Sequence, residues 1–452
     1  MYRPKDRQTQ TLFPELFTLG GSLRPDNRWM KLAALIPWEE LETLYRSYFN
    51  ADRGRPAKDS RLVCGLLIVK HITTDSDEKT VERFLESPYV QWFCGYDLFV
   101  TTDEINPSLL SKMRKRLGVK FFKEFEDKLI DVLIGRKILK AGSHLLDATV
   151  IPANIEYPTD VKLLNRARQW LVVVIKKIGK KLNLKNVRTY CKVARLLYIN
   201  FQKKRRKTKK TIMVMRGKML RFVRRNIRQI EELLTIHKQK LSDLELKKLY
   251  RHLDVIINLY AQQLEMWKKK ALSVGNRIVS LHLPHIRPIV RGKDGRNVEF
   301  GPKALLSWVG RFAFLDKLEF EAYNEGPHLK ESLEQYKNRF GCFPTDSTGD
   351  GIFGSRDNRD TLKELEVRGG FKALGRPAKE CESEKRWLRK KRALRNSRME
   401  GIIGHGKTHF GLDRIRYTID GGEEIWTRMG LLGMNLMTAV KIMKKAEAKA
   451  AA

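Results

Sequence analysis

Three carboxylates in this chain stand in sequence contexts that could bind metal ions: Asp147, Asp350 and Glu400. Asp147 lies inside the run 144–152, His-Leu-Leu-Asp-Ala-Thr-Val-Ile-Pro, which is apolar and rich in β-branched residues. This pattern predicts a short buried strand. A charge inside such a strand costs free energy unless it is paired or binds a metal. Asp147 therefore needs a cation, and the alternative is an aspartate that caps a loop at a strand end.

The chemistry open to such carboxylates follows from their oxygens, which are hard ligands suited to Mg²⁺ or Mn²⁺. Two such ions, about 3.5–4 Å apart, can activate an attacking oxygen and stabilise a leaving oxygen in phosphodiester displacement. Asp350 lies in the loop 345–351, and Glu400 follows a very polar helix predicted over 380–399. We hypothesise that Asp147, Asp350 and Glu400 converge, with Asp346 as a rival for the second position.

Four segments of different character must position these carboxylates. Residues 1–120 predict a compact N-terminal helical domain that binds DNA, because short helices with a basic final helix are joined by tight turns. That arrangement resembles a helix-turn-helix, and a plain helical bundle with a solvated basic face is the alternative. Over residues 121–160 we predict the start of a catalytic domain, with a helix and the strand that contains Asp147. Over 161–275 we predict a basic helical insertion, and over 276–452 the remainder of the catalytic domain with a C-terminal helix.

The segment after residue 276 carries both strand and helix signals. We predict strands over 277–283, 286–290, 298–300, 305–309, 312–320 and 367–374, and helices over 327–340, 356–365, 380–399 and 423–443. The order is strand, helical insertion, meander, helix, turn, helix, strand and helix. This is the order of an RNase H-like fold, so the predicted fold class is α/β, with a mixed sheet and helices.

The net charge of +38, from 90 Lys and Arg residues against 52 Asp and Glu, points to a polyanionic partner. Nucleic acid is the default partner, and an anionic membrane surface is the weaker alternative. Residues 161–230 contain 24 Lys or Arg residues and no Asp or Glu. Because these cations cannot pair internally, we predict that the insertion binds phosphates. The side chains predicted to contact DNA there are Lys203, Lys204, Arg205, Arg206, Lys207, Lys209 and Lys210.

A second cationic feature precedes a predicted helix at residue 60. Arg53 and Arg55 belong to an Arg-Gly-Arg-Pro sequence, which is typical of extended arginines that enter the minor groove of A·T tracts. We predict these two residues as DNA contacts as well. A proline-directed turn before the helix is the alternative, and it is the interpretation that we favour.

Several classes of protein are disfavoured by the sequence. No apolar stretch approaches the ~20 residues of a transmembrane helix, and the N-terminus has no apolar signal region. The five cysteines are scattered and never form a CxxC pair, which indicates a reducing compartment without a disulfide framework or a thiolate zinc site. We therefore expect a cytoplasmic, nucleoid-associated protein. Residues 401–408 match the spacing of a P-loop, but a charged helix rather than an apolar strand precedes them.

The chain resembles bacterial insertion-sequence transposases of the DDE type, in the large group numbered five, over about residues 53–436. The motifs that carry this resemblance are residues 147–153, 157–160, 284–293, 298–301, 322–326, 350–353, 356–359, 400–407 and 410–412. The resemblance implies that Asp147, Asp350 and Glu400 hold two Mg²⁺ or Mn²⁺ ions. It also implies that Lys407, seven residues after Glu400, contacts DNA near the cut. The chain departs from the family signature at Asn396 and Ala393, where the family has Arg and Tyr.

The resemblance further implies an activity. The protein is expected to cleave double-stranded DNA at the terminal inverted repeats of an insertion element and to join the freed 3′ ends to target DNA. Two ends must be held together, so a homodimer in a synaptic complex is expected. The alternatives are a non-catalytic basic nucleic-acid-binding protein and an inactive transposase copy.

Overall fold

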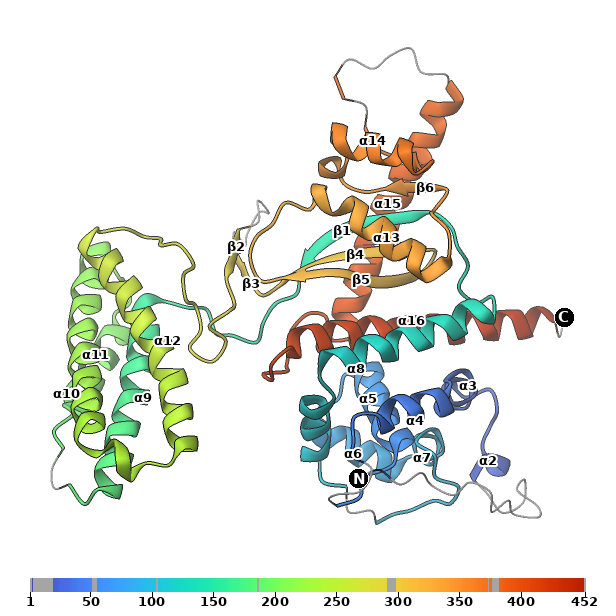
Figure 1. Cartoon of the computed structure of the whole chain (residues 1–452). Helices are drawn as coiled ribbons and strands as arrows, with labels where there is room; N and C mark the ends of the chain where they lie inside the picture. Colours follow the sequence, from blue (N-terminus) through green and yellow to red (C-terminus); the bar gives the residue numbers. More distant parts are fainter. Residues whose placement is uncertain are drawn as a thin grey trace. The chain divides into compact units, whose positions relative to one another are not determined.

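The computed structural model describes residues 2, 19–50, 55–102, 105–184, 187–290, 298–372, 374–375 and 382–450. The chain divides into two compact units, which we describe separately: the sheet unit, residues 1–153 with 302–452, and the helical unit, residues 154–301 (Figure 1). The insertion predicted over 161–275 is thus part of a larger unit. The N-terminal helices, predicted as a domain of their own over 1–120, belong to the sheet unit.

The sheet unit is built on five strands in the order β5-β4-β1-β6-β7 (Figure 1). They are β1 (His144–Val150), β4 (Lys303–Val309), β5 (Phe312–Glu319), β6 (Asp346–Thr348) and β7 (Arg368–Gly369). Strand β4 is antiparallel to both of its neighbours, whereas β6 is parallel to β1 and β7. The predicted α/β class with a mixed sheet is therefore confirmed.

Helices of the sheet unit come from both ends of the chain. They are α2 (Leu19–Ser22), α3 (Arg28–Leu35), α4 (Trp38–Arg46), α5 (Ser60–Thr73), α6 (Asp77–Glu86), α7 (Pro88–Phe93), α8 (Ser108–Gly135), η2 (Gly326–His328), α13 (Leu329–Phe340), η3 (Gly351–Phe353), α14 (Arg356–Glu364), α15 (Glu382–His409) and α16 (Gly422–Ala450). Side-chain caps fix several starts: Asn27 accepts a hydrogen bond at the start of α3, and Asp59 does so for α5. Helix α8 is kinked at Gly118, whose φ of +66° is a conformation that glycine adopts readily.

Alternation along β1 divides its side chains between the two faces of the sheet. Leu146 and Ala148 join an apolar cluster with residues of α13 and α14. Leu145 and Ile151 join the main core, to which α8 and α16 contribute. Asp147 is two residues after Leu145, so its side chain points to the same face as Leu145. This is the face opposite α13 and α14.

The C-terminal helix α16 packs on β5, as the apolar pattern over 423–443 predicted. Asn435 of α16 makes a paired contact with the backbone of Ala313 in β5. Its side-chain oxygen accepts from the Ala313 N–H at 2.9 Å, and its side-chain nitrogen donates to the Ala313 carbonyl at 2.8 Å. This side chain is buried, and both of its polar groups are satisfied.

The helical unit consists of long helices and a small hairpin (Figure 1). Its elements are α9 (Asp160–Lys181), α10 (Cys191–Lys203), α11 (Lys209–His237), η1 (Lys238–Lys240), α12 (Asp243–Lys268), β2 (Pro288–Val290) and β3 (Val298–Phe300). The strand predicted over 277–283 is wrong, since no strand forms there. The hairpin β2–β3 is also separate from β4 and β5, so the predicted meander is split between two sheets. Among the described residues, no helix is long and apolar enough to cross a membrane.

Asp160 links the helices of this unit. It is the first residue of α9, and its carboxylate pairs with Arg216 of α11 and with Arg277, which follows α12. The side-chain nitrogen of Gln263 in α12 donates to it as well, at 2.9 Å. Because no acid follows Asp160 until residue 231, this one carboxylate neutralises cations that would otherwise be buried without a partner.

A candidate active site on neighbouring strands

Strands β1 and β6 bring Asp147 and Asp350 to the same place. The parallel register pairs His144 with Ser347 and Leu145 with Thr348. Continued by two residues, this register sets Asp147 opposite Asp350, just beyond the end of β6. Asp147 and Asp350 are far apart in the sequence, but the pairing of β1 with β6 brings them close together. The hypothesis that the carboxylates converge requires this of these two residues.

Arg395 of α15 lies between the two carboxylates. One guanidinium nitrogen is 3.7 Å from Asp147 Oδ2, and another is 3.7 Å from Asp350 Oδ1. Both distances are too long for hydrogen bonds, so the arginine neutralises the pair only by charge. Its Nε is buried and has no hydrogen-bond partner among the described residues. The sequence interpretation missed Arg395, because nothing in a helix this polar sets one arginine apart.

The two carboxylates differ in their surroundings. Asp147 is largely buried, and burial raises the pKa of its carboxyl above the ordinary value. The Arg395 guanidinium opposes this rise in pKa, whereas the charges of Asp350 and Glu325 add to it. Glu325 itself pairs with Lys303 at 2.5 Å. Asp350 is 64% exposed, and its side chain accepts from the Gly351 N–H at 2.7 Å.

Glu400 is placed differently. It lies on α15 five residues after Arg395, which is about 140° around the helix from the side that meets Asp147. Its side chain is exposed, and no hydrogen bond or ion pair joins it to any residue that the structure describes. Within the described ranges, no group of three or more His, Cys, Asp or Glu side chains is arranged to hold a metal ion. The structure thus brings Asp147 and Asp350 together but does not bring Glu400 to them.

These placements bear on the predicted metal ions. Among the described residues, Asp147 accepts one hydrogen bond, from the Ala148 N–H, and Arg395 is 3.7 Å away, too far for a hydrogen bond. The Asp147 oxygens can therefore bind a cation. Asp350 has exposed oxygens beside it. The two aspartates therefore fit a divalent cation, whereas Glu400, as placed, does not complete the set of ligands.

Asp346, the rival of Asp350, lies at the other end of β6 and is buried. Lys391 Nζ is 2.7 Å from its carboxylate, and the Ser143 hydroxyl donates to it at 2.9 Å. Lys391, whose side chain is 14% exposed, is thus a close charge partner for this aspartate, although Oδ2 itself accepts no hydrogen bond among the described residues. Lys391 is one helical turn before Arg395 on α15, so this helix supplies a cation to each end of the β1–β6 pair.

The P-loop alternative is excluded by the last third of α15. Residues 401–408 lie inside this continuous helix, so they cannot form a phosphate-binding loop. Lys407 belongs to the same stretch, and its Nζ is 3.4 Å from the carbonyl oxygen of Val150 at the end of β1. The predicted DNA contact Lys407 thus lies on the same helix and along the same strand as Arg395 and Asp147.

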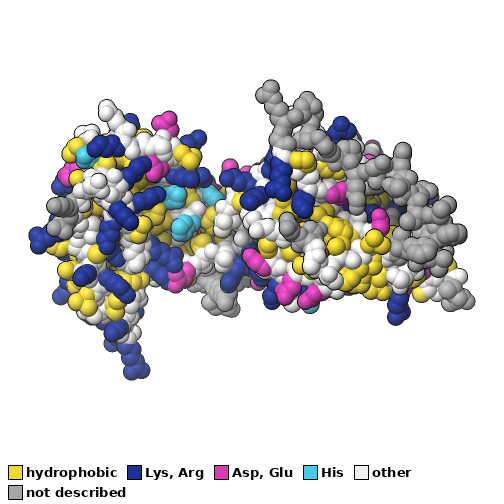
Figure 2. Space-filling view, turned by 90° about the horizontal axis from the view of Figure 1, so that it is seen from below, with side chains coloured by type: hydrophobic (Ala, Val, Ile, Leu, Met, Phe, Trp, Pro, Cys, Tyr) yellow, Lys and Arg dark blue, Asp and Glu magenta, His cyan; other side chains and the backbone are white. Residues whose placement is uncertain are grey.

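The predicted DNA contacts of the helical unit are exposed. Lys203 ends α10, Lys209 and Lys210 begin α11, and the connection between these helices carries Lys204 to Lys207. Figure 2 shows Lys and Arg side chains spread over this unit, at the left of the view. Arg55 is exposed before α5, and Arg53 lies outside the described residues. No described contact assigns these side chains to a partner within the chain, apart from Lys207, which donates to the Gln202 carbonyl.

Comparison with known proteins gave two matches. Residues 17–116 match a family described as "Transposase domain (DUF772)". The chain is 34% identical over 164 residues to a protein of Rhizobium meliloti described as "Uncharacterized protein ORF8 in nfe locus". That match covers 36% of this chain and 79% of the relative. No solved structure matches the chain. The segment 17–116 comprises α2 to α7 and the beginning of α8.

Proposed function

Because this chain belongs to the same family as the nfe-locus ORF8 protein and carries a transposase domain, we propose that it is a DNA transposase of the DDE type. It would bind the terminal inverted repeats of an insertion element, cut the DNA there and join the 3′ ends to target DNA. The observation that carries this proposal is the pair Asp147, on β1, and Asp350, just beyond the end of the adjacent strand β6, with Arg395 at 3.7 Å from each.

The fold supports the same proposal. The order of elements in the sheet unit is the one expected of an RNase H-like domain, with the helical unit inserted after β1. In such a domain, Asp147 and Asp350 would hold the divalent ions. Those ions, when bound, supply Lewis acidity to an attacking and a leaving oxygen of the phosphodiester.

The protein's own side chains have separate tasks in this proposal. Asp147, which is largely buried, would provide one negative charge, and Asp350 would provide accessible oxygens beside it. Lys407 would bind a backbone phosphate near the scissile bond. The cations Lys203 to Lys210 would bind phosphates further away, and a second copy of the chain would hold the second DNA end.

Glu400 is the part of the triad that needs a change of structure. For its side chain to join Asp147, α15 would have to turn or shift when DNA binds. Arg395 would leave the carboxylates in the same movement. We propose that this rearrangement accompanies binding of DNA and metal.

The test is strand nicking of supercoiled DNA that carries the sequences flanking the gene, with Mg²⁺ or Mn²⁺. We expect wild type to nick at the repeat ends, and Asp147→Asn and Glu400→Gln to bind the DNA without nicking it. Asp254→Asn, an exposed aspartate of α12, serves as the matched control and should nick like wild type. Equal nicking by Asp147→Asn and wild type would refute the carboxylate mechanism.

The second candidate function is a DNA-binding protein without nuclease activity, including a transposase copy that has lost it. This candidate is favoured because, within the described ranges, no group of three or more His, Cys, Asp or Glu side chains is arranged to hold a metal ion. If wild type binds the DNA tightly and does not nick it with either metal, the second candidate is the correct one.

A further inference from the structure

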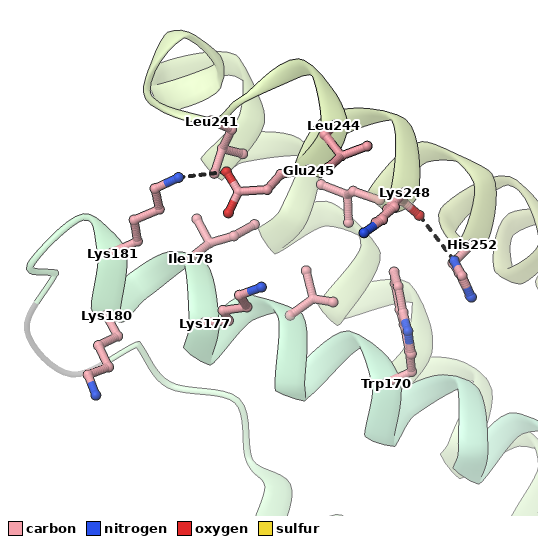
Figure 3. A pocket seen from close by; sticks show the side chains of 12 residues that line it. Trp170, Lys177, Ile178, Lys180, Lys181, Leu241, Leu244, Glu245, Lys248 and His252 are labelled. Carbon is pink, nitrogen blue, oxygen red and sulfur yellow. Dashed lines mark hydrogen bonds and ion pairs between the residues drawn. The ribbon is translucent and has the colours of Figure 1, made fainter. Parts of the chain in front are cut away.

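An apolar groove runs between α9 and α12 in the helical unit, and the proposed DNA binding does not use it (Figure 3). Its volume is about 660 Å³. The apolar side chains that line it are Trp170, Val174 and Ile178 of α9, together with Leu241, Leu244 and Leu249 of the α12 side. Leu244 is 63% exposed.

The two walls of the groove run antiparallel. At one end, the rings of Trp170 and His252 stack 5.4 Å apart with an angle of 14° between their planes. At the other end, Lys181 pairs with Glu245 at 2.6 Å (Figure 3). The stretch 170–181 is about 16 Å long at 1.5 Å per residue, which is about three helical turns. A third helix of three turns or more could therefore lie along the groove and bury anchors at positions i, i+3 or i+4, and i+7.

Nothing in the described part of the helical unit covers this face. The short helix α10 packs against α9 and α11 instead, so the α9–α12 side stays open. Of the 17 large hydrophobic side chains exposed among the described residues, 13 belong to the helical unit. Yellow hydrophobic side chains lie among the dark blue cations of this unit in Figure 2. Of these 13, Leu244 lines the groove, and the apolar side chains beside it form a contiguous apolar surface rather than a scattered set.

The rim of the groove is positively charged. Lys177, Lys180, Lys181 and Lys248 line it, and Glu245 is the one acid there. Glu245 is already occupied by Lys181 and by the Ser242 cap at the start of α12. The other three lysines make no ion pair with any residue that the structure describes. An occupant with flanking carboxylates would therefore gain charge complementarity on both sides of its apolar face.

From this groove we infer a docking site for a partner protein: an amphipathic α-helix whose apolar face is flanked by Asp and Glu. The apolar floor favours a protein helix over nucleic acid, because a nucleic acid would pair with the rim lysines but leave the six apolar side chains uncovered. The charge argues against a second copy of this unit, since residues 161–270 carry 32 basic and 6 acidic side chains, and two such surfaces repel each other. The inference does not depend on DNA cleavage.

The test measures binding of a labelled peptide to the full chain without DNA, by fluorescence anisotropy in moderate salt. The probe is a synthetic helix of about 18 residues with Leu along one face and Glu elsewhere. A scrambled peptide of the same composition has the same charge but no apolar face. We expect the helical probe to bind at least about tenfold more tightly than the scrambled one.

Two matched pairs of variants locate the site. Leu244→Glu should weaken probe binding about tenfold, whereas Leu196→Glu, 60% exposed on α10, should leave it unchanged. Both substitutions are at exposed positions, and circular dichroism will verify that each variant is folded. The double variant Lys177→Glu with Lys248→Glu should weaken binding more than Lys192→Glu with Lys238→Glu, which removes the same charge elsewhere.

Three results would overturn the inference. The first is equal binding of the helical and scrambled peptides, which would indicate attraction by charge alone. The second is an equal response to Leu244→Glu and Leu196→Glu. The third is loss of duplex DNA binding on Leu244→Glu with no loss of probe binding, which would make the groove a nucleic-acid site. None of these results measures nicking, and the first two are obtained without DNA, so the inference and the proposed function fail separately.

Discussion

The two ends of the β1–β6 pair hold their acids in opposite ways. At one end, Asp346 is buried against Lys391 at 2.7 Å and accepts from Ser143. At the other end, Asp147 and Asp350 share Arg395 at 3.7 Å, without a hydrogen bond from it. The same helix supplies both cations. A tight buried pair belongs to the fold, whereas a loosely neutralised pair leaves carboxylate oxygens free to bind a ligand.

The largest expected effect separates the two rival acids in catalysis. Asp350→Asn should lower nicking by more than about 100-fold, because that factor is already reached when a residue that merely orients a metal ligand is lost. Asp346→Asn should retain the activity of wild type per folded molecule. The measurement is nicking rate against the fraction folded from circular dichroism. The reverse result would make Asp346 the second ligand and would remove the distinction between the two ends.

The second effect is on stability. Asp346→Asn should lower the free energy of unfolding by about 3 kcal/mol, because it removes the charge partner of Lys391, which is 14% exposed and keeps its hydrogen bond to the Ser143 hydroxyl. Urea unfolding measures this, and Asp350→Asn, at an exposed position, is the control that should change little. The double variant Asp346→Asn with Lys391→Met should recover part of the loss. A loss no greater than that of Asp350→Asn would contradict the structural role of the Asp346 pair.

The third effect concerns Arg395. If Asp147 and Asp350 hold the metal, Arg395→Gln removes a competing charge and should tighten Mn²⁺ binding about fivefold, equivalent to the ~1 kcal/mol between unit charges 4 Å apart in water. Lys391→Gln should leave Mn²⁺ binding unchanged and destabilise the fold instead. Isothermal titration calorimetry reads the binding without any DNA. Weaker Mn²⁺ binding by Arg395→Gln would mean that the arginine positions the carboxylates rather than competing with the metal.

The smallest effect is the pH dependence of stability at Asp147. Burial raises the pKa of this carboxyl in the folded protein, so its contribution to stability is full below the pKa of the unfolded chain and is lost as pH rises through the folded pKa. Asp147→Asn does not titrate. The thermal unfolding temperature of Asp147→Asn should therefore rise relative to that of wild type as the pH increases from acid to neutral. A constant difference across that range would mean that the pKa of Asp147 is not raised.

Part of this site could be predicted from the sequence. The strand around Asp147 was evident, because an uninterrupted apolar run with β-branched residues has few alternatives. The sequence favours Asp350 over Asp346 only through the register of Phe353 and Asn358 with the resembled family, whereas the parallel register of β6 decides which acid stands opposite Asp147. The orientation of Glu400 could not be predicted from the sequence. Most of α15 is so polar that no apolar stripe indicates which side of the helix faces the sheet. The false strand at 277–283 has the right alternation but lacks a neighbouring strand to pair with.

The contact of Asn435 with Ala313 has a consequence for solubility. Strand β5 is at the edge of the sheet, where unpaired backbone groups can recruit a strand from another molecule and start aggregation. The Asn435 amide occupies one N–H and one carbonyl of that edge, as a peptide group of a sixth strand would do. Helix α16 thus blocks one position of this edge with a single side chain, and Gln335 of α13 donates to a second, the Asp316 carbonyl.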